Sequence, residues 1–576
     1  MDKRTIIGFI IIGLIIILYP LYMEWITGGK GIQRAPHEPL TETDTLRETP
    51  PSVEEREETP PPAREPKPVG LVARDTLPEE KLVRVETELY AAELSSRGGV
   101  LKSFTLKEYQ YSEDGDIQLL PPEGAQSALN LIFPDSNINL EKYSFRVDKG
   151  GLVLDRGAPS GTIEFSLAAE SGAQIAKRYT FFNGRYDFEL EFESKGPGRL
   201  DLGRKYLLGW APGLNSTEED RRSDLDKFTA YSMMGEELSD YKKFHQLKEE
   251  NVGILQEAGS GETKWVATRT KYFVAALVPL SRDAAGFAAS GKRSFSFKEG
   301  EEVETRRIGV SLEMPLEAQA VLKDRFMIYV GPLDYFVLKG YRRGLDRMVD
   351  LSGSIIRPFS VAILWLFVNI HKIIPNYGFV IILFTLLMKF AFHPLTRKST
   401  AATMKMQALQ PKLAQLKERY KKDPARLNQE TMKLYKQAGV NPLGGCLPLL
   451  FQMPVFWALF VVFRSTIELR GANFLLWLTD LSQKDPYYVL PIMMGVAMFW
   501  QQKLTMKDPK QAMLVYFMPV LFFFLFRNFP AGLTLYWTVF NILSLIETYY
   551  FKHKGLHPSM LAAEPAPAKK KMRSPD

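Results

Sequence analysis

Long apolar runs dominate the last third of the chain, and their length predicts helices that cross a membrane. Five such runs occupy residues 376–393, 443–463, 487–502, 512–526 and 531–551. A helix needs about 20 apolar residues to cross a bilayer, so the runs at 487–502 and 512–526 are short. A bundle built from them implies a membrane that is locally thinned.

A sixth run, at residues 358–374, is ambiguous. It contains Asn369, His371 and Lys372. Polar residues within so short a run suit a helix that lies in the membrane interface as well as they suit a span. We favour an interfacial helix within residues 351–375.

An apolar run near the start of the chain predicts an anchor. Residues 5–22 carry no charge. The basic pair in front of them also suits a cleaved signal peptide, but no small-residue cleavage site follows. Instead, the run ends among Tyr19, Tyr22 and Trp25, whose rings suit a membrane interface. We therefore predict a transmembrane anchor over residues 1–27.

Between this anchor and the bundle the pattern changes twice. Residues 28–80 are rich in Pro, Glu, Thr and Arg and poor in large apolar residues, so we expect a disordered tether. Over residues 81–350, apolar and polar positions alternate with the period of half-buried strands. The clearest alternating segments are 82–89, 178–182, 186–193 and 293–298.

Turn signals separate these segments and complete the prediction for residues 81–350. They stand at Gly98-Gly99, Asn183-Gly184 and Gly196-Pro197-Gly198. We predict one large antiparallel β-sandwich domain. Its last part, residues 332–350, has helical periodicity and leads to the membrane.

The distribution of charge predicts the topology. The chain carries 73 Lys and Arg against 66 Asp and Glu, a net charge of +7. Residues 395–441 hold eleven basic and three acidic side chains, or +8, and the tail at 552–576 is also basic. Because positive loops stay in the cytoplasm, six spans with both termini inside satisfy every loop and place the β-domain outside. The excess charge is therefore topological, and we do not expect recognition of a specific nucleic acid sequence.

The basic loop at 395–441 has a helical pattern of its own. Its apolar residues form two stripes, Leu409, Leu413, Leu416 and Tyr420 in the first and Leu427, Thr431, Leu434 and Ala438 in the second. Between them, Asp423 and Pro424 supply an N-cap and a first-turn proline. We predict a helical hairpin in the cytoplasm, which is either a solvated connector or a docking arm.

Candidates for catalysis or metal binding are few. The single cysteine, Cys446, excludes a disulfide framework, and the six histidines have no ligand-type spacing, so we expect no metal and no cofactor. Residues 286–293 resemble a nucleotide-binding loop, but Arg293 stands where Ser or Thr must hold magnesium. Ser544 has no histidine on a facing span at similar depth. We predict no catalytic residue.

Polar side chains inside the spans are the candidate functional residues. Lys389 lies in the run 376–393, where a charge costs about 2.5 to 3.5 kcal/mol. Its amine could reach the headgroups by snorkelling. However, other spans also carry polar positions: Thr385 on the same face, Gln452 in a second span, and Thr534, Thr538, Asn541 and Thr548 in the last. We expect these faces to converge on a wet cavity that contains one positive charge.

A transporter is the alternative that this polar pattern leaves open. Polar stripes in spans also mark solute pathways, so a secondary transporter of a small anionic solute would show them. The lack of internal repeats and a charge near only one leaflet argue against it.

Several long motifs resemble the YidC family of bacterial membrane protein insertases. In the bundle they are Val440–Pro454, Phe456–Leu459, Asp485–Pro491, Phe517–Pro519 and Pro530–Trp537. In the β-domain, Trp265–Pro279 and Tyr329–Pro332 are similar to the periplasmic domain of the Gram-negative branch. The resemblance covers the whole bundle and part of the β-domain.

The resemblance implies a fold class and a set of site residues. It implies a membrane α-helical bundle of six spans, five of which form the core at 376–551, plus a periplasmic all-β supersandwich. In that family a groove charge, usually arginine, attracts the polar part of a nascent chain; here it falls on Lys389, which keeps the charge but loses the bidentate fork. The expected groove residues are Lys389, Thr385, Gln452, Phe456, Thr534, Tyr536, Trp537 and Asn541.

The resemblance also implies a function, partners and a location. It implies an insertase and chaperone that moves nascent membrane proteins from the cytoplasm into the lipid of the bacterial inner membrane without nucleotide hydrolysis. Expected partners are nascent membrane proteins, the lipid bilayer and the Sec translocon. The ribosome or targeting factors are expected on the hairpin at 395–441 and on the tail at 552–576.

Overall fold

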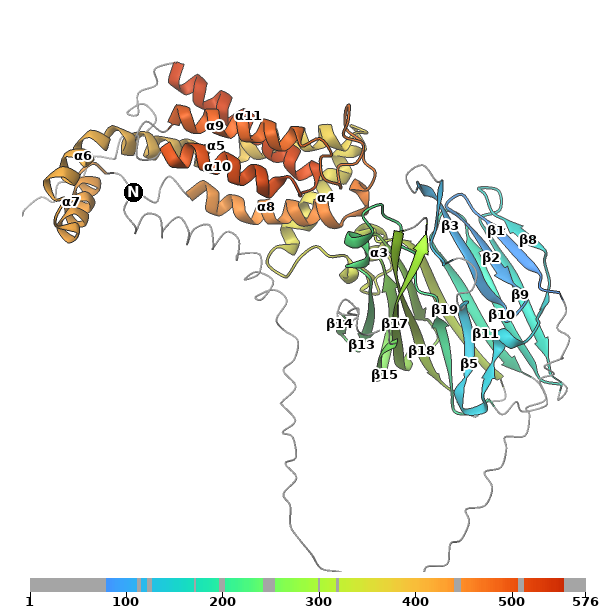
Figure 1. The fold of residues 1–576 in the computed structure, drawn as a ribbon. Coiled ribbons are helices and arrows are strands. Elements are labelled where there is room, and N and C mark those ends of the chain that lie inside the picture. Colours follow the sequence, from blue (N-terminus) through green and yellow to red (C-terminus); the bar gives the residue numbers. More distant parts are fainter. Residues whose placement is uncertain are drawn as a thin grey trace, which may run out of the picture. The chain divides into compact units, whose positions relative to one another are not determined.

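Two compact units make up the chain, a β-rich unit that ends at Met348 and a helical unit that begins at Val349 (Figure 1). The computed structural model describes residues 79–110, 115–121, 127–169, 172–195, 202–241, 254–298, 301–316, 321–439, 447–505 and 512–553. The predicted anchor at 1–27, nearly all of the predicted tether at 28–80 and the tail beyond residue 553 lie outside these ranges.

The β-rich unit is one hydrogen-bonded set of nineteen strands. They are β1 (Leu82–Glu86), β2 (Tyr90–Ser95), β3 (Val100–Gln110), β4 (Asp116–Gln118), β5 (Ala128–Phe133), β6 (Ile138–Asn139), β7 (Arg146–Val147), β8 (Gly151–Val153), β9 (Ser160–Ala168), β10 (Gln174–Phe182), β11 (Asp187–Lys195), β12 (Lys205–Trp210), β13 (Thr229–Met234), β14 (Glu237–Asp240), β15 (Ile254–Arg269), β16 (Phe273–Pro279), β17 (Ala284–Lys298), β18 (Glu301–Pro315) and β19 (Val321–Pro332). Among the described strands, β1 and β8 pair in parallel and the other pairs are antiparallel. A large, mainly antiparallel β-region is thereby confirmed, whereas its arrangement as a sandwich stays a prediction.

Most predicted strands lie where alternation placed them, with one correction. The segments 178–182, 186–193 and 293–298 fall on β10, β11 and β17. The segment 82–89 is wrong over its last three residues. There the Thr87 hydroxyl accepts hydrogen bonds from the backbone N–H of Leu89 (3.2 Å) and of Tyr90 (3.0 Å), so a turn ends β1.

Short helices join and close the strands. They are η1 (Pro134–Ser136), η2 (Leu140–Lys142), α2 (Arg221–Leu225), α3 (Tyr335–Gly340) and η4 (Leu345–Met348). The last two confirm the helical periodicity predicted after residue 332. Asp334 begins α3 because its carboxylate accepts the backbone N–H of Phe336 and Val337.

A lysine lies in the core of the β-rich unit. Lys177 on β10 is fully buried, and its ammonium donates to the carbonyl oxygens of Gly98 (3.1 Å) and Leu129 (2.8 Å). Burial lowers its pKa to about 7, although nearby Glu141 favours the charged form. The lysine thus joins two chain segments, and Leu129 itself has a left-handed backbone with φ of 63°.

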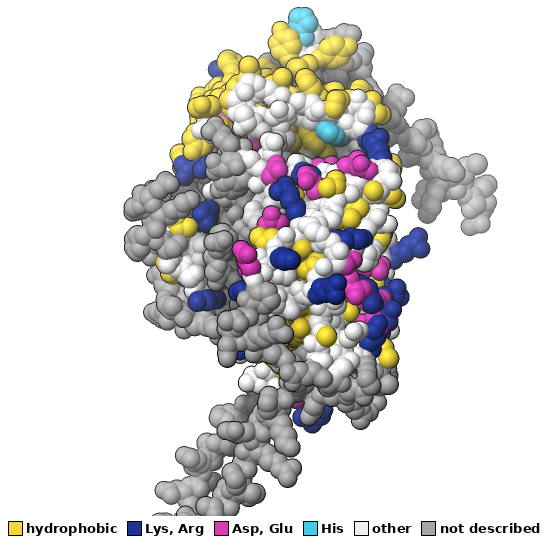
Figure 2. Space-filling model, turned by 90° about the vertical axis from the view of Figure 1, so that its right-hand side faces the viewer, with side chains coloured by type: hydrophobic (Ala, Val, Ile, Leu, Met, Phe, Trp, Pro, Cys, Tyr) yellow, Lys and Arg dark blue, Asp and Glu magenta, His cyan; other side chains and the backbone are white. Residues whose placement is uncertain are grey.

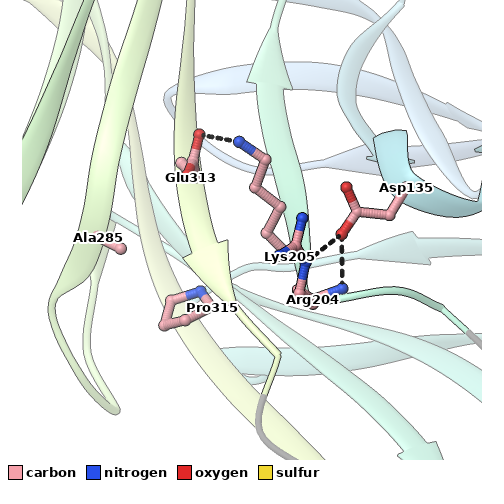
Figure 3. A pocket seen from close by; sticks show the side chains of 6 residues that line it. All are labelled: Asp135, Arg204, Lys205, Ala285, Glu313 and Pro315. Carbon is pink, nitrogen blue, oxygen red and sulfur yellow. Dashed lines mark hydrogen bonds and ion pairs between the residues drawn. The ribbon is translucent and has the colours of Figure 1, made fainter.

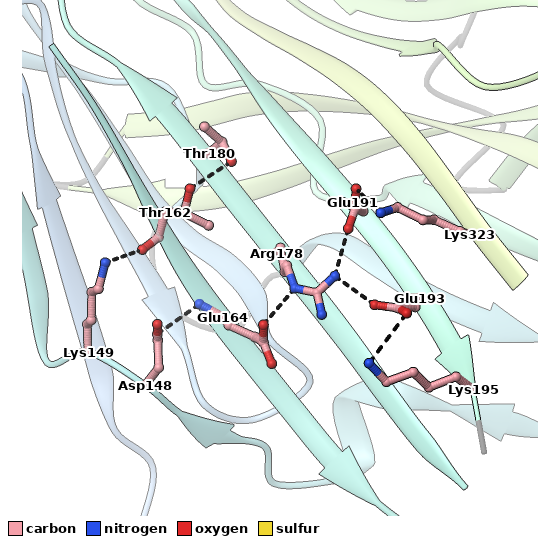
Figure 4. Close-up of polar contacts among 10 residues, drawn as sticks. All are labelled: Asp148, Lys149, Thr162, Glu164, Arg178, Thr180, Glu191, Glu193, Lys195 and Lys323. Carbon is pink, nitrogen blue, oxygen red and sulfur yellow. Dashed lines mark hydrogen bonds and ion pairs between the residues drawn. The ribbon is translucent and has the colours of Figure 1, made fainter. Parts of the chain in front are cut away.

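On the opposite side of β10, Arg178 organises a network of charges across several strands (Figure 4). Its guanidinium lies 2.6 Å from Glu164 on β9 and 2.7 and 2.6 Å from Glu191 and Glu193 on β11. Glu191 also pairs with Lys323, which extends the network to β19. Cross-strand pairs of opposite charge of this kind support the register of a sheet.

The helical unit follows the apolar runs closely. Its helices are α4 (Arg357–His371), α5 (Tyr377–Ala408), α6 (Gln410–Arg419), α7 (Pro424–Gln437), α8 (Leu447–Ser465), η6 (Ile467–Leu469), α9 (Val489–Thr505), α10 (Ala512–Phe526) and α11 (Ala531–His553). The bounds of α10 agree with the predicted run. The predicted run 376–393 ends at His393, but the corresponding helix α5 continues through Pro394 and ends only at Ala408.

Large apolar side chains are exposed on this unit, and apolar side chains gather at the top of the view in Figure 2. Phe390, Tyr516 and Val520 are more than half exposed, and Ile492 and Phe524 are exposed to a similar degree. Lipid accommodates such a surface, whereas water does not. By length and composition, residues Tyr377–Thr396 form the described stretch that can cross a membrane by itself; Gln452–Ser465 and Val515–Phe526 are shorter apolar stretches.

The predicted hairpin is present as α6 and α7. Asp423 caps α7 by accepting the backbone N–H of Arg426 (3.0 Å), and Pro424 begins the helix. Leu413 of α6 is buried, while α7 has no fully buried residue. The hairpin therefore presents most of its surface to its surroundings.

The start of α5 is fixed against the segment that follows η6. The Asn376 amide donates to the carbonyl oxygen of Phe474 (3.2 Å), and its carbonyl accepts the backbone N–H of Gly378 (2.9 Å). Gly378 has no room for a side chain, because a Cβ there would lie 1.9 Å from the Phe474 ring. A glycine is required at this contact.

Candidate functional site

Lys389 belongs to α5, and its side chain reaches α11. Its ammonium is 2.8 Å from a carboxylate oxygen of Glu547 and 2.7 Å from the hydroxyl oxygen of Ser544. The ring of Phe540 lies 4.8 Å from it. The side chain is only 15% exposed. The lysine therefore points to a neighbouring helix, which argues against the snorkelling alternative.

Glu547 is the residue of this cluster that sequence reasoning missed. One carboxylate oxygen pairs with Lys389, and the other lies 3.4 Å from Nδ1 of His393, one turn further along α5. The available signal was a carboxylate inside the apolar run 531–551, the counterpart of the lysine in the run 376–393.

A second group of predicted residues joins α8 to α11. Gln452 is buried and donates a hydrogen bond from its amide to the hydroxyl of Tyr536. The rings of Phe456 and Trp537 meet edge to face, with centroids 5.3 Å apart. The ring centroids of Phe384 on α5 and Tyr536 on α11 are 6.1 Å apart. These contacts therefore connect α5, α8 and α11.

Each side chain of the predicted polar stripe donates a hydrogen bond within its own helix, and Thr538 also donates to the carbonyl oxygen of Leu490 on α9 (3.2 Å). Thr385 donates to the carbonyl oxygen of Ile381 (2.7 Å), and Thr534 donates to that of Pro530 (3.2 Å). Asn541 donates to the carbonyl oxygen of Trp537 (2.7 Å). These three residues are buried, and each bonds to the backbone of its own helix. The wet cavity around them stays a prediction.

A pocket in the β-rich unit is also lined by charged groups (Figure 3). It has a volume of about 300 Å³ and is lined by Asp135, Arg204, Lys205, Ala285, Glu313 and Pro315. Its charges pair with one another, Arg204 with Asp135 and Lys205 with Glu313 at 2.9 Å. The described residues contain no group of three or more side chains able to hold a metal ion.

Comparison with known proteins identifies the family. Residues 82–366 match the family described as YidC periplasmic domain, and residues 369–557 match the family described as 60Kd inner membrane protein. The "Membrane protein insertase YidC" of Prosthecochloris aestuarii is 34% identical, with 99% of each chain covered. The chain belongs to the YidC family of membrane protein insertases. That of Syntrophus aciditrophicus is 32% identical over 96% of this chain and 100% of its own.

Each of the two units corresponds to one of the matched family descriptions. The β-rich unit corresponds to the periplasmic domain, and the helical unit corresponds to the inner membrane protein. A solved structure titled "Active YidC insertase crystal structure with the first transmembrane domain resolved" covers 84% of this chain and 94% of its own, with 20% identity and a TM-score of 0.37. The alternative of an anionic-solute transporter finds no support among these relatives.

Proposed function

We propose that the insertase contacts its clients, the nascent membrane proteins, through the residues that α5, α8 and α11 share. The observation that carries this proposal is the position of Lys389, whose charge lies in an apolar run and is held between two helices. Gln452, Phe456, Tyr536 and Trp537 lie along the same three helices and supply polar and aromatic contacts. The groove that would hold the client is part of the proposal.

The physical role of such a site is to lower the cost of moving a polar segment. A client's polar or acidic stretch loses water as it enters the apolar layer, and a cation with hydrogen-bonding neighbours replaces part of that hydration. Transfer of about 20 apolar residues into lipid then makes insertion favourable. This scheme requires no nucleotide and no catalytic residue.

The arrangement in the membrane is also proposed. Six spans with both termini in the cytoplasm place the hairpin of α6 and α7 inside and the β-rich unit in the periplasm. The charge of +8 over residues 395–441 supports the cytoplasmic hairpin, and the match to a periplasmic domain over residues 82–366 supports the outer side for the β-rich unit. We propose that this unit is a supersandwich.

We propose that the basic hairpin and the tail at 552–576 receive clients. Their positive charge suits ribosomal RNA or an acidic targeting factor, and α7 leaves its side chains accessible. A neighbouring Sec translocon is the proposed partner within the bilayer.

Reconstitution with variants of Lys389 tests the proposed site. The purified chain is placed in liposomes without nucleotide, and insertion of a single-span client with an acidic translocated tail is measured by protease protection. Lys389→Arg keeps the charge and retains insertion, whereas Lys389→Ala and Lys389→Glu lower it at least about fivefold, the effect of losing one charge-assisted contact. Equal insertion by all three variants would assign Lys389 a purely structural role.

A further inference from the structure

The cation of the proposed site is already neutralised within the protein. Glu547 supplies the carboxylate, Ser544 a hydroxyl and Phe540 a ring face, all from α11. A client carboxylate that approached Lys389 would meet this carboxylate first. The resting arrangement therefore has the form of an occupied anion site, in which the occupant is a side chain of the chain itself.

The second oxygen of Glu547 shows that this occupant is incompletely held. Oε1 is buried and has no hydrogen-bond partner among the described residues, although Nδ1 of His393 lies 3.4 Å away. A buried carboxylate oxygen without a hydrogen-bond donor in the protein is held less firmly than one that is paired. His393 is about half exposed and lies on the same helix as Lys389.

We infer that Glu547 is an internal competitor that occupies Lys389 in the resting insertase and gives way to a carboxylate of the client. This inference rests on the proposed function, since it assumes that Lys389 contacts the client. Exchange of one carboxylate for another keeps the charge around Lys389 constant, so neither the empty nor the loaded state leaves the lysine unpaired. The displaced Glu547 keeps His393 as a neighbour, since Nδ1 of His393 lies 3.4 Å from its second carboxylate oxygen.

The competitor determines which clients benefit from the site. A client with Asp or Glu in its translocated segment can replace Glu547, whereas a client with Asn or Gln cannot offer an equal charge. Glu547 therefore limits the benefit that an acidic segment gains from Lys389, whereas a neutral segment, which does not compete for the lysine, is not affected. Loss of its charge should favour acidic clients specifically, because they no longer compete for Lys389.

Two matched clients test this inference. They share one apolar segment and differ only in a translocated tail that contains either Asp or Asn. Insertion of both into liposomes of defined composition is compared for the wild-type chain, for Glu547→Gln, and for Glu237→Gln, an exposed carboxylate of β14 in the other unit. For Glu547→Gln the ratio of acidic to neutral insertion should rise about threefold to fivefold, the scale of one partly exposed ion pair. The ratio should not change for Glu237→Gln.

The double variant Lys389→Glu with Glu547→Lys keeps the test valid if Glu547→Gln does not fold. It retains an ion pair between α5 and α11 but reverses its direction, so insertion should shift from the acidic client to a third client with a Lys-containing tail. A ratio that is unchanged or lowered in Glu547→Gln, or a double variant that behaves as the wild type, would overturn the inference alone. Failure of the wild-type chain to insert either client would overturn the proposed function as well.

Discussion

Lys177 is fully buried in the β-rich unit, and it predicts a pH dependence. Its folded pKa of about 7 lies below the ordinary value of 10.5 because burial disfavours the ammonium. Between these two pH values the unfolded chain binds the proton more readily than the folded one. The free energy of unfolding should therefore rise as the pH increases from 7 towards 10, by at most about 1.4 kcal/mol per pH unit.

Hydrogen exchange over β10 measures this effect locally. Protection of residues 174–182, corrected for intrinsic exchange, should increase from pH 7 to pH 9 in the wild-type chain and stay nearly constant in Lys177→Met. Other titrating groups are common to both proteins, so the difference isolates Lys177. The same pH slope in both would show that the lysine is protonated in the same way in the folded and unfolded states.

Gly378 predicts a steric effect at one residue of the helical unit. A Cβ at this position would lie 1.9 Å from the Phe474 ring, so Gly378→Ala should push α5 away from its partner and destabilise the unit by about 1 to 3 kcal/mol. Thermal unfolding in detergent measures this loss. Gly495→Ala in α9 is the matched control, because its Cβ would meet Pro519 at an ordinary 3.6 Å and should cost nothing. Equal melting temperatures would contradict the close contact.

Individual charges were only partly predictable from the sequence. Lys389 was found because a lysine in an apolar run is costly wherever the helix lies. Its partner Glu547 stands 158 residues later, and no local pattern shows that α5 and α11 are neighbours. The polar stripe had the opposite outcome: its spacing was correct, but Thr385 and Thr534 bond to their own backbone, an option that periodicity does not distinguish from a water-lined face.

At the scale of elements, helix bounds followed composition where the chain changes abruptly. The ends of α10 were predicted because charged or turn residues flank the apolar run on both sides. The end of α5 was not, because Pro394 resembles a helix end. A proline removes one backbone hydrogen bond, and the remaining bonds of this 32-residue helix carry it to Ala408.

The hairpin of α6 and α7 predicts a separable role in delivery. Removal of residues 409–438 should leave the rest of the helical unit folded, because the two helices of the hairpin contain a single buried residue, Leu413, and it is removed with them. Insertion of clients that are still attached to ribosomes should fall, while insertion of purified clients should not. The comparison of these two assays checks the prediction. A variant that is unfolded by circular dichroism would instead make the hairpin part of the structural core.

At the scale of the whole molecule, the two units predict a division of labour. All the predicted site residues, from Thr385 to Asn541, lie in the helical unit. A chain without residues 81–348 should therefore insert simple single-span clients at nearly the wild-type rate in vesicles. The deletion must extend to the end of the unit. A shorter deletion that kept β19 would leave it as an unpaired strand, because its partners are β11 and β16. Background activity from a folded truncation would place the β-rich unit in the mechanism.

Lys389 and its partners are far apart in the sequence, so they are synthesised at different times. Lys389 leaves the ribosome before Ser544, its partner 155 residues later, and before Glu547. Until α11 is made, α5 must therefore stay in the membrane with an uncompensated charge, which is costly in lipid. An insertase of this family is itself a membrane protein. Its own α5 is difficult to insert until α11 has been synthesised, because Lys389 has no partner before then. Released chains that end before residue 531, the first of α11, should be extracted from membranes more readily than released chains that end at residue 553.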